Sequence, residues 1–281
     1  MIYFTDAEID QLISDDAPLG DLTTRALGIG EEPATLDYIA RETLMVSGTE
    51  EVVRMAQKLG IEIKGFATSG SRVEEGETIL SANGSAQALH LLWRAGLAML
   101  EFASAIATRT AALVDSVCEV SNSPIVAGTR KHPPYLKKVA LKALMAGGGT
   151  PHRFGLSDSI LVFEEHLRFL PDPESSIREL KHRQKEKKVV VEVHNSEDAV
   201  RTTEWGADVI QIDKMPSGEF QKTAAACRAI NPDVVMIAAG GINPGNALEY
   251  ANAGADVLVT SWMYFGKPAN IGVRLIPAIP T

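Results

Sequence analysis

The sequence predicts an α/β protein in which a mixed α/β N-terminal part precedes a parallel sheet of six or seven strands. From Ile125 onward, short Val- and Ile-rich runs alternate with helical segments, as expected for strands buried on both faces. The last four runs start at intervals of 20, 25 and 23 residues. An incomplete α/β barrel and an open doubly wound sheet both fit, and in both the ligands bind at the carboxyl ends of the strands. The six runs are Ile125–Ala127, Ile160–Phe163, Val189–Val193, Val209–Ile212, Val234–Ala238 and Val257–Val259, and Ala146–Gly149 is a candidate seventh.

The first ~105 residues show both helical and strand periodicity, with boundaries good to a few residues. Helices are expected at Asp6–Ser14, at Glu50–Leu59 before Gly60, and at Ala86–Ala112. Ala34–Ile39 alternates like a strand, and Val73–Leu80 has the pattern of two strands joined by a tight turn.

Composition excludes several classes of function. A net charge of −9 argues against nucleic-acid or membrane-surface binding, which require a basic face. Cys118 and Cys227 are far apart in the sequence, which fits a reducing cytoplasm and offers no metal or redox framework. The apolar stretch Leu89–Ala107 is interrupted by charged residues, so we expect a buried helix and no membrane span.

Basic residues gather where acidic ones are absent. No Asp or Glu lies between Glu119 and Asp158, and the cations of this stretch include Arg130 and Lys131. This pair follows the first apolar run and precedes two prolines, so it lies at a strand end. Guanidinium and ammonium groups there predict binding of a carboxylate or phosphate. The alternative, a solvated basic helix face, suits Lys137, Lys138 and Lys142.

Glycine-rich segments supply two further candidates. Gly147-Gly148-Gly149 allows close backbone approach and is followed by His152 and Arg153. Gly240-Gly241 follows an apolar run, and Asn243 and Pro244 suit the start of a helix, which together indicate a phosphate cradle. Ser261 follows the next run and adds a hydroxyl donor. Plain turns are the alternative for both segments.

Two acidic residues end neighbouring runs. Glu192 lies in Val189–Val193, and Asp213 follows Val209–Ile212. Such carboxylates bind Mg²⁺ beside a polyphosphate or stabilise positive charge on a ribose ring. The alternative is an ion pair with Lys214 or another basic residue.

These features, in this order, resemble the quinolinate phosphoribosyltransferase (nicotinate-nucleotide pyrophosphorylase) family. The resemblance runs nearly end to end, and its ModD subgroup, associated with molybdate-transport genes, is similar in Pro151–Leu156, Ile160–Phe163 and Thr260–Pro268. The motifs that carry it are Gly20–Thr24, Ser104–Thr108, Gly128–Lys131, Gly147–Gly149, His152–Leu156, Val191–Val193, Ile212-Asp213 and Gly240–Ile242.

The resemblance implies an N-terminal α/β sandwich at 1–108, joined by the tail 268–281, and an incomplete six- or seven-stranded α/β barrel at 109–267. It implies transfer of phosphoribose from phosphoribosyl pyrophosphate to a ring nitrogen of a small anionic acceptor, with Mg²⁺. It also implies a cytoplasmic homodimer in which Arg94 completes the partner's site. The expected catalytic residues are Glu192, Asp213 and Lys131; the expected binding residues are Arg94, Arg130, Lys131, His152, Arg153, Phe163, Gly240, Gly241 and Ser261; and the expected Mg²⁺ ligands are Glu192 and Asp213.

Departures from the family pattern concern the acceptor side. Phe163 stands where the family has a lysine, and Trp93, Thr150 and His194 also replace family residues. One lost cation and two added aromatics predict a flatter, less anionic acceptor than quinolinate. Two other functions remain open: a Schiff-base lyase using Lys131, and a non-catalytic oxyanion-binding protein for molybdate handling.

Overall fold

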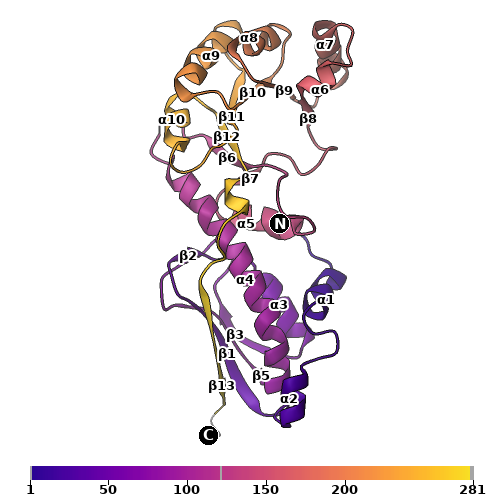
Figure 1. The fold of residues 1–281 in the computed structure, drawn as a ribbon, viewed down its shortest axis with the longest axis vertical. Helices are drawn as coiled ribbons and strands as arrows, with labels where there is room; N and C mark the ends of the chain where they lie inside the picture. The colour runs from indigo at the N-terminus through magenta and orange to yellow at the C-terminus, as the bar shows by residue number, and fades with distance from the viewer. Residues whose placement is uncertain (1, 121, 279–281) are drawn as a thin grey trace. The chain divides into compact units, whose positions relative to one another are not determined.

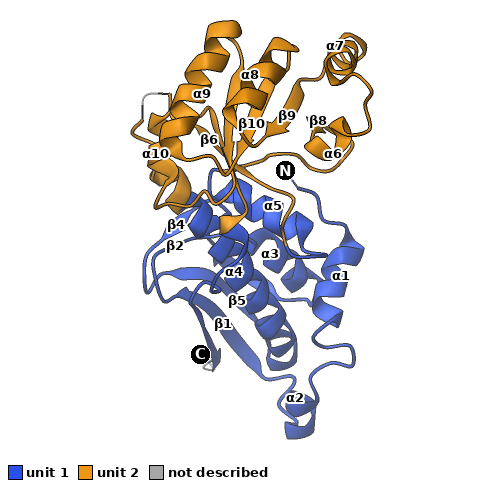
Figure 2. Ribbon diagram, turned by 45° about the horizontal axis from the view of Figure 1, so that its top comes forward, with its two compact units in different colours: residues 1–111, 133–148, 263–281 blue, residues 112–132, 149–262 orange. Residues whose placement is uncertain are grey.

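The computed structural model describes residues 2–120 and 122–278, which form two compact units (Figure 2). Unit 1 comprises residues 1–111, 133–148 and 263–281, and unit 2 comprises residues 112–132 and 149–262. The C-terminal tail groups with the N-terminal part. The segment 133–148, which the sequence places in the barrel domain, groups with unit 1.

Unit 1 contains an antiparallel sheet of four strands in the order β13-β1-β5-β3 (Figure 1). The tail enters this sheet because β13 (Ile271–Pro277) pairs with β1 (Pro33–Ala40) from Ala34 to Ala40. The remaining strands are β2 (Leu44–Met45), β3 (Glu62–Phe66), β4 (Arg72–Val73) and β5 (Thr78–Ser85). The strands β4 and β5, expected from one strand-turn-strand pattern, belong to different sheets, since β4 pairs with β2.

The long apolar helix α4 (Ala86–Asp115), most of which belongs to unit 1, packs on β1. The Tyr38 hydroxyl donates to the carbonyl oxygens of Leu92 and Trp93 at 2.9 and 3.0 Å, and Gly96 leaves room for that ring. A Cβ at Gly96 would lie 2.4 Å from the Tyr38 hydroxyl oxygen. The other helices are α1 (Asp6–Ser14), α2 (Leu22–Leu27), α3 (Thr49–Lys58) and α5 (Lys137–Ala146).

Helix α4 also passes a length and hydropathy test for a membrane span, with a mean hydropathy of 1.4. Of its most apolar window, 61% is buried inside the structure. This burial accounts for the apolar composition of the helix, in agreement with the expectation of a core helix.

Unit 2 is built on a parallel sheet of seven strands in the order β7-β6-β12-β11-β10-β9-β8. All six predicted apolar runs form strands: β6 (Ile125–Gly128), β8 (Ile160–Val162), β9 (Val189–Val193), β10 (Val209–Asp213), β11 (Val235–Ala239) and β12 (Val257–Thr260). The seventh strand, β7, is Thr150–Pro151 and not the suggested Ala146–Gly149. The edges of the curled sheet are β7 and β8, so the barrel is incomplete between them.

Helices of unit 2 follow the strands and cover one face of the sheet (Figure 2). They are α6 (Glu164–Leu167), α7 (Pro173–Arg183), α8 (Ser196–Glu204), α9 (Ser217–Ile230) and α10 (Ala247–Asn252), and a 3₁₀ turn, Trp262–Tyr264, follows β12. The other face buries Ala127, Val209, Ile237, Ala239 and Val259 in one apolar cluster. Because all seven strands are parallel, their carboxyl ends meet at one edge, where a site is expected.

Candidate active site

A cavity of about 530 Å³ opens at the carboxyl ends of the seven strands of unit 2. Ten of the eleven residues predicted for the site line it, and every strand or the loop that follows it contributes. The lining is Thr129, Arg130, Lys131, His152, Arg153, Leu161, Phe163, Glu192, Gln211, Asp213, Lys214, Ala239, Gly240, Gly241, Ile242, Val259, Thr260, Ser261 and Trp262.

The basic side of the cavity comes from the ends of β6 and β7. The backbone there is fixed, since the Lys131 N–H donates to Thr129 Oγ1 at 3.1 Å and the His152 N–H donates to the Gly128 carbonyl at 2.9 Å. Burial lowers the pKa of His152, the neighbouring Arg153 charge lowers it further, and Asp158 opposes them in part, so the neutral imidazole is favoured. This side therefore offers two guanidinium groups, one lysine and one imidazole to an anion.

Arg153 is buried, with only 8% of its surface exposed. Burial lowers the pKa of its guanidinium, and the nearby Arg130 charge acts in the same direction. The guanidinium carbon lies 5.7 Å from the centroid of the Phe163 ring, which also stacks on His166 at 5.7 Å. Phe163 thus packs against a cation of the site, in addition to the expected role of stacking on an acceptor.

The acidic side comes from the ends of β9 and β10. Glu192 and Gln211 are partners in the parallel register, and the Gln211 side-chain amide donates to Glu192 Oε2. Burial raises the pKa of Glu192; the Gln211 hydrogen bond opposes this, and the Asp213 carboxylate adds to it. Asp213 Oδ2 lies 3.5 Å from Lys214 Nζ and 3.9 Å from His194 Nδ1. Asp213 therefore forms the ion pair with Lys214 that was the alternative to metal binding, whereas Glu192 accepts a hydrogen bond from the Gln211 amide.

Gly240 and Gly241 both have left-handed backbones, with φ of 85° and 79°. None of the hydrogen bonds of residues 2–120 and 122–278 uses the backbone N–H of Gly241 or Ser261, which leaves both amides for solvent or a ligand. The predicted helix start at Asn243 and Pro244 is wrong, because α10 begins at Ala247. Asn243 Oδ1 instead accepts from the Gly245 N–H at 2.9 Å in a turn, and its Nδ2 donates to the Gly241 carbonyl.

The triple glycine has a packing role. A Cβ at Gly147 would lie 2.4 Å from the Ala107 carbonyl oxygen and 2.6 Å from Thr110 Cβ, so glycine allows this turn to approach α4. Gly147 and Gly148 belong to unit 1 and do not line the cavity. Close approach of the backbone was expected toward a ligand or another strand, and the structure shows that Gly147 approaches helix α4.

Sequence reasoning missed Gln211 and Trp262 and gave Lys214 only as an ion-pair partner. Gln211 was detectable as the one polar residue within the apolar run Val209–Ile212, and it is 4% exposed. Trp262 follows Ser261, lines the cavity and is 37% exposed.

Arg94 is the predicted residue that lies elsewhere. It is exposed on α4 and lines a mainly apolar cavity of about 460 Å³ in unit 1, together with Leu12, Asp15, Asp16 and Phe102. Its predicted role requires a second copy of the chain.

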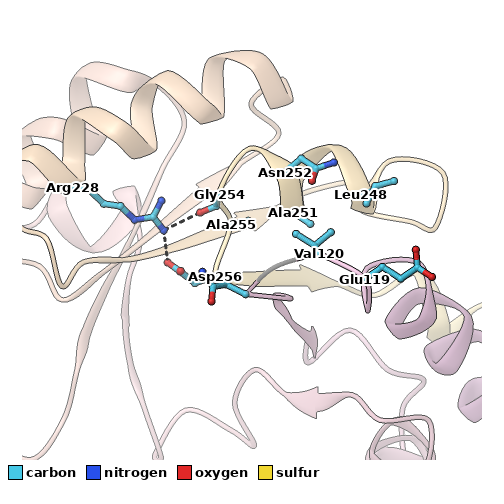
Figure 3. Close-up of a pocket in the computed structure, with 10 residues that line it drawn as sticks. Glu119, Val120, Arg228, Leu248, Ala251, Asn252, Gly254, Ala255 and Asp256 are labelled. Atoms are coloured by element: carbon cyan, nitrogen blue, oxygen red, sulfur yellow. Dashed lines mark hydrogen bonds and ion pairs between the residues drawn. The ribbon is translucent and has the colours of Figure 1, made fainter.

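A larger cavity of about 780 Å³ lies beside the amino-terminal ends of β6 and β12 (Figure 3). Its cation, Arg228, is already engaged by Asp256 Oδ2 at 2.8 Å and by the Gly254 carbonyl at 2.9 Å. Because its cation is satisfied and it lies opposite the carboxyl ends of the strands, we assign it a structural role.

Comparison with known proteins agrees with this geometry. Residues 21–104 match the N-terminal domain of quinolinate phosphoribosyl transferase, and residues 106–269 match the C-terminal domain. The chain belongs to the quinolinate phosphoribosyl transferase family. Relatives in this family are named as pyrophosphorylases, and the match to the C-terminal domain covers the part of the chain that holds the cavity.

Among curated relatives, "Putative pyrophosphorylase ModD" of Pasteurella multocida is 33% identical over 97% of this chain and 98% of its own. The ModD protein of Rhodobacter capsulatus is 38% identical over 90% of this chain and 98% of its own. A relative from Methanothermobacter thermautotrophicus, named as a nicotinate-nucleotide pyrophosphorylase, is 32% identical over 89% of this chain and 91% of its own.

Solved structures share the fold. NadC from Streptococcus pyogenes superposes with a TM-score of 0.88 at 22% identity, covering 99% of this chain and 100% of that one. The nicotinate-nucleotide pyrophosphorylase of Francisella tularensis gives a TM-score of 0.87 at 22% identity, covering 95% of this chain and 94% of that one. The family's phosphoribosyltransferase fold is therefore present in full.

Proposed function

We propose that this protein transfers phosphoribose from phosphoribosyl pyrophosphate to a ring nitrogen of a small heteroaromatic acid. The observation that carries the proposal is the division of one cavity into three parts: unpaired cations on β6 and β7, carboxylates on β9 and β10, and free backbone amides after β11 and β12. Each part matches one group of the reactants. The acceptor acid lies at Arg130 and Arg153, the ribose at Glu192 and Asp213, and the 5′-phosphate at Gly240, Gly241 and Ser261.

In this reaction the ring nitrogen of the acceptor attacks the anomeric carbon of the ribose. The bond from that carbon to the pyrophosphate oxygen breaks, and its electron pair leaves with pyrophosphate. Positive charge develops on the ribose as the bond breaks, and the two carboxylates stabilise it. His152 remains neutral and donates or accepts a hydrogen bond, while Lys131 binds the departing pyrophosphate. Catalysis of this kind rests on positioning and electrostatics.

Mg²⁺ fits the donor set. Mg²⁺ is commonly bound by one or two carboxylates, with waters and substrate phosphates completing its shell. Glu192 and Asp213 supply two such groups, and no cluster of three or more His, Cys, Asp or Glu side chains suited to a metal occurs in the described part of the chain. We propose that these two carboxylates hold the ion, which would neutralise charge on the pyrophosphate.

The acceptor differs from quinolinate in this proposal. Phe163 occupies the position of the family's lysine, and one partner of a dicarboxylate is lost. Removing one partner of a desolvated charge pair typically costs ~2–5 kcal/mol, or roughly thirty- to several-thousandfold in affinity. A flat ring with one carboxylate is favoured by Phe163 and Trp262 through stacking.

A screen of pyridine and other heteroaromatic acids, with pyrophosphate release as the readout, tests the proposal. We expect release with at least one monocarboxylate, weak release with quinolinate, and a gain with quinolinate in Phe163→Lys. Quinolinate turnover with kcat/KM of ~10⁴ M⁻¹s⁻¹ or more in the unaltered protein contradicts the acceptor assignment. If none of the acceptors causes pyrophosphate release, the rival functions are favoured. Binding of molybdate then supports the oxyanion-binding protein, and borohydride trapping of an adduct on Lys131 supports the lyase.

We further propose a homodimer in which Arg94 reaches the partner's cavity. The support is its exposed position in unit 1, apart from the cavity of unit 2. Mixing inactive Arg94→Ala with inactive Arg153→Ala subunits should restore activity, since one site of a mixed dimer is then intact. A stable monomer with full activity rules out the shared site.

A further inference from the structure

Lys214 has a backbone conformation that lysine rarely adopts. Its φ is 59°, and the only other non-glycine residues with positive φ in the described part of the chain are Asn122 and Tyr135. A left-handed conformation brings the Cβ of an L-residue close to its own carbonyl oxygen, so it is normally left to glycine or asparagine. Strained residues of this kind concentrate at functional sites, where the surrounding structure holds them in place.

The conformation is held by the ends of β10 and β11. The Lys214 N–H donates to the Ala239 carbonyl at 2.8 Å. A Cβ at Gly240 would lie 2.5 Å from Lys214 Cγ and 2.9 Å from the Lys214 nitrogen, so the two residues are packed against each other. The stem of the lysine therefore packs on Gly240, which lines the cavity.

Its ammonium group is not used up by the protein. Lys214 Nζ lies 3.5 Å from Asp213 Oδ2, but 79% of the lysine side chain is exposed. Exposed ion pairs of this kind contribute little to stability, so the pair with Asp213 does not offset the cost of the strained backbone. The cation thus lies beside the Asp213 carboxylate in the lining of the cavity, to which Gly241 also contributes, and it is open to an anionic group bound there.

We propose that Lys214 binds the 5′-phosphate of the ribosyl donor, together with the backbone amides after β11 and β12. This inference rests on the proposed function and adds a donor-binding side chain to it. Lys214 belongs to the donor half of the cavity because its neighbours are Asp213 and Gly240, whereas the acceptor cations Arg130 and Arg153 come from β6 and β7.

Calorimetric titration with ribose 5-phosphate tests this directly. Lys214→Asn removes the charge and keeps a residue that tolerates the left-handed backbone. We expect its affinity for ribose 5-phosphate to fall ~10- to 100-fold, the range of a charge-assisted hydrogen bond. The KM for the donor should rise likewise while the KM for the acceptor stays the same, and Lys214→Arg should restore most of the affinity.

Tyr135→Asn is the matched control. Tyr135 has a φ of 64°, is fully exposed and lies in unit 1, so this variant relieves the same strain away from the cavity. Both asparagine variants should gain stability, with Tm rising by roughly 2–4 °C, but only Lys214→Asn should lose affinity. Affinity of Lys214→Asn within twofold of the unaltered protein overturns the inference, and failure of the unaltered protein to bind ribose 5-phosphate overturns the proposed function itself.

Discussion

The acid-free stretch between Glu119 and Asp158 contributes cations to two regions with opposite uses. Lys138 and Lys142, on α5 in unit 1, pair with acids far away in sequence: Lys138 Nζ lies 2.6 Å from Glu8, and Lys142 Nζ lies 2.7 Å from Glu50. Arg130, Lys131 and Arg153 follow β6 and β7 in unit 2 and form no ion pair with the described residues. The same local composition thus serves structure in one region and leaves charge for a ligand in the other.

The difference lies in the element that carries each cation. Helix α5 presents Lys142 toward α3, where Glu50 and the buried Glu51 form ion pairs with it. The carboxyl ends of parallel strands lie together at one edge of the sheet and are followed by loops. Cations in these loops therefore line a cavity and do not pack against another helix. A lack of nearby acids in the sequence therefore does not by itself identify a binding site.

The largest effect is expected from Arg153→Lys, which keeps the charge and removes the planar fork. We expect kcat/KM to fall ~10- to 100-fold, as for the loss of a charge-assisted bidentate contact. Arg201→Lys is the matched control, because Arg201 also lies over an aromatic ring, Trp205 at 5.5 Å, but outside the cavity. Equal kinetics for the two variants would remove Arg153 from the site.

An effect on stability alone is expected from Lys142→Met. It leaves Glu51, which is 5% exposed, and the half-buried Glu50 without their cation. We expect unfolding free energy to fall by roughly 2 kcal/mol, less than the ~3–5 kcal/mol of a fully buried pair, with unchanged turnover per folded molecule. Lys138→Met, at a more exposed pair, should change stability little. Chemical denaturation measures the stability of each variant, and activity assays measure its turnover. A loss of turnover per folded molecule in Lys142→Met would contradict the assignment of Lys142 to stability alone.

The cost of Lys142→Met should depend on pH. Burial alone would raise the pKa of Glu50, but hydrogen bonds from Lys142 and Ser69 outweigh it and hold this pKa at about 2. A depressed pKa stabilises the fold above the ordinary value of 4.5, and this contribution is lost as pH falls toward 2. The difference in unfolding free energy between the unaltered protein and Lys142→Met should therefore be largest above pH 4.5 and should decrease as the pH falls below 4.5.

The smallest effect is expected from Gln211→Met. The amide opposes the raised pKa of Glu192, so its removal lets burial and Asp213 raise that pKa further. If transfer requires the ionised carboxylate, the acid limb of the kcat/KM profile moves to higher pH, whereas Gln221→Met on the exposed face of α9 leaves the profile unchanged. An unmoved acid limb would show that Gln211 does not position Glu192.

Much of unit 2 was predictable because its strands are buried on both faces, which forces continuous apolar runs such as those of β9 and β10. β7 was misplaced because Thr150–Pro151 carries no apolar run. Partners far apart in sequence were not predictable: Lys142 meets Glu50, and Gly147 packs on Ala107 of α4. The site residues were predictable as strand-end residues, but the burial of Arg153 and its packing on Phe163 required the fold.

A crystal structure with phosphoribosyl pyrophosphate and Mg²⁺ bound would show where the donor binds. We expect the 5′-phosphate at Gly240, Gly241, Ser261 and Lys214, and the ribose beside Glu192 and Asp213. The cavity of unit 1 that Arg94 lines and the cavity beside Arg228 should hold no donor. A donor bound in either of those cavities, with the strand-end cavity of unit 2 free of it at saturating concentration, would contradict the account.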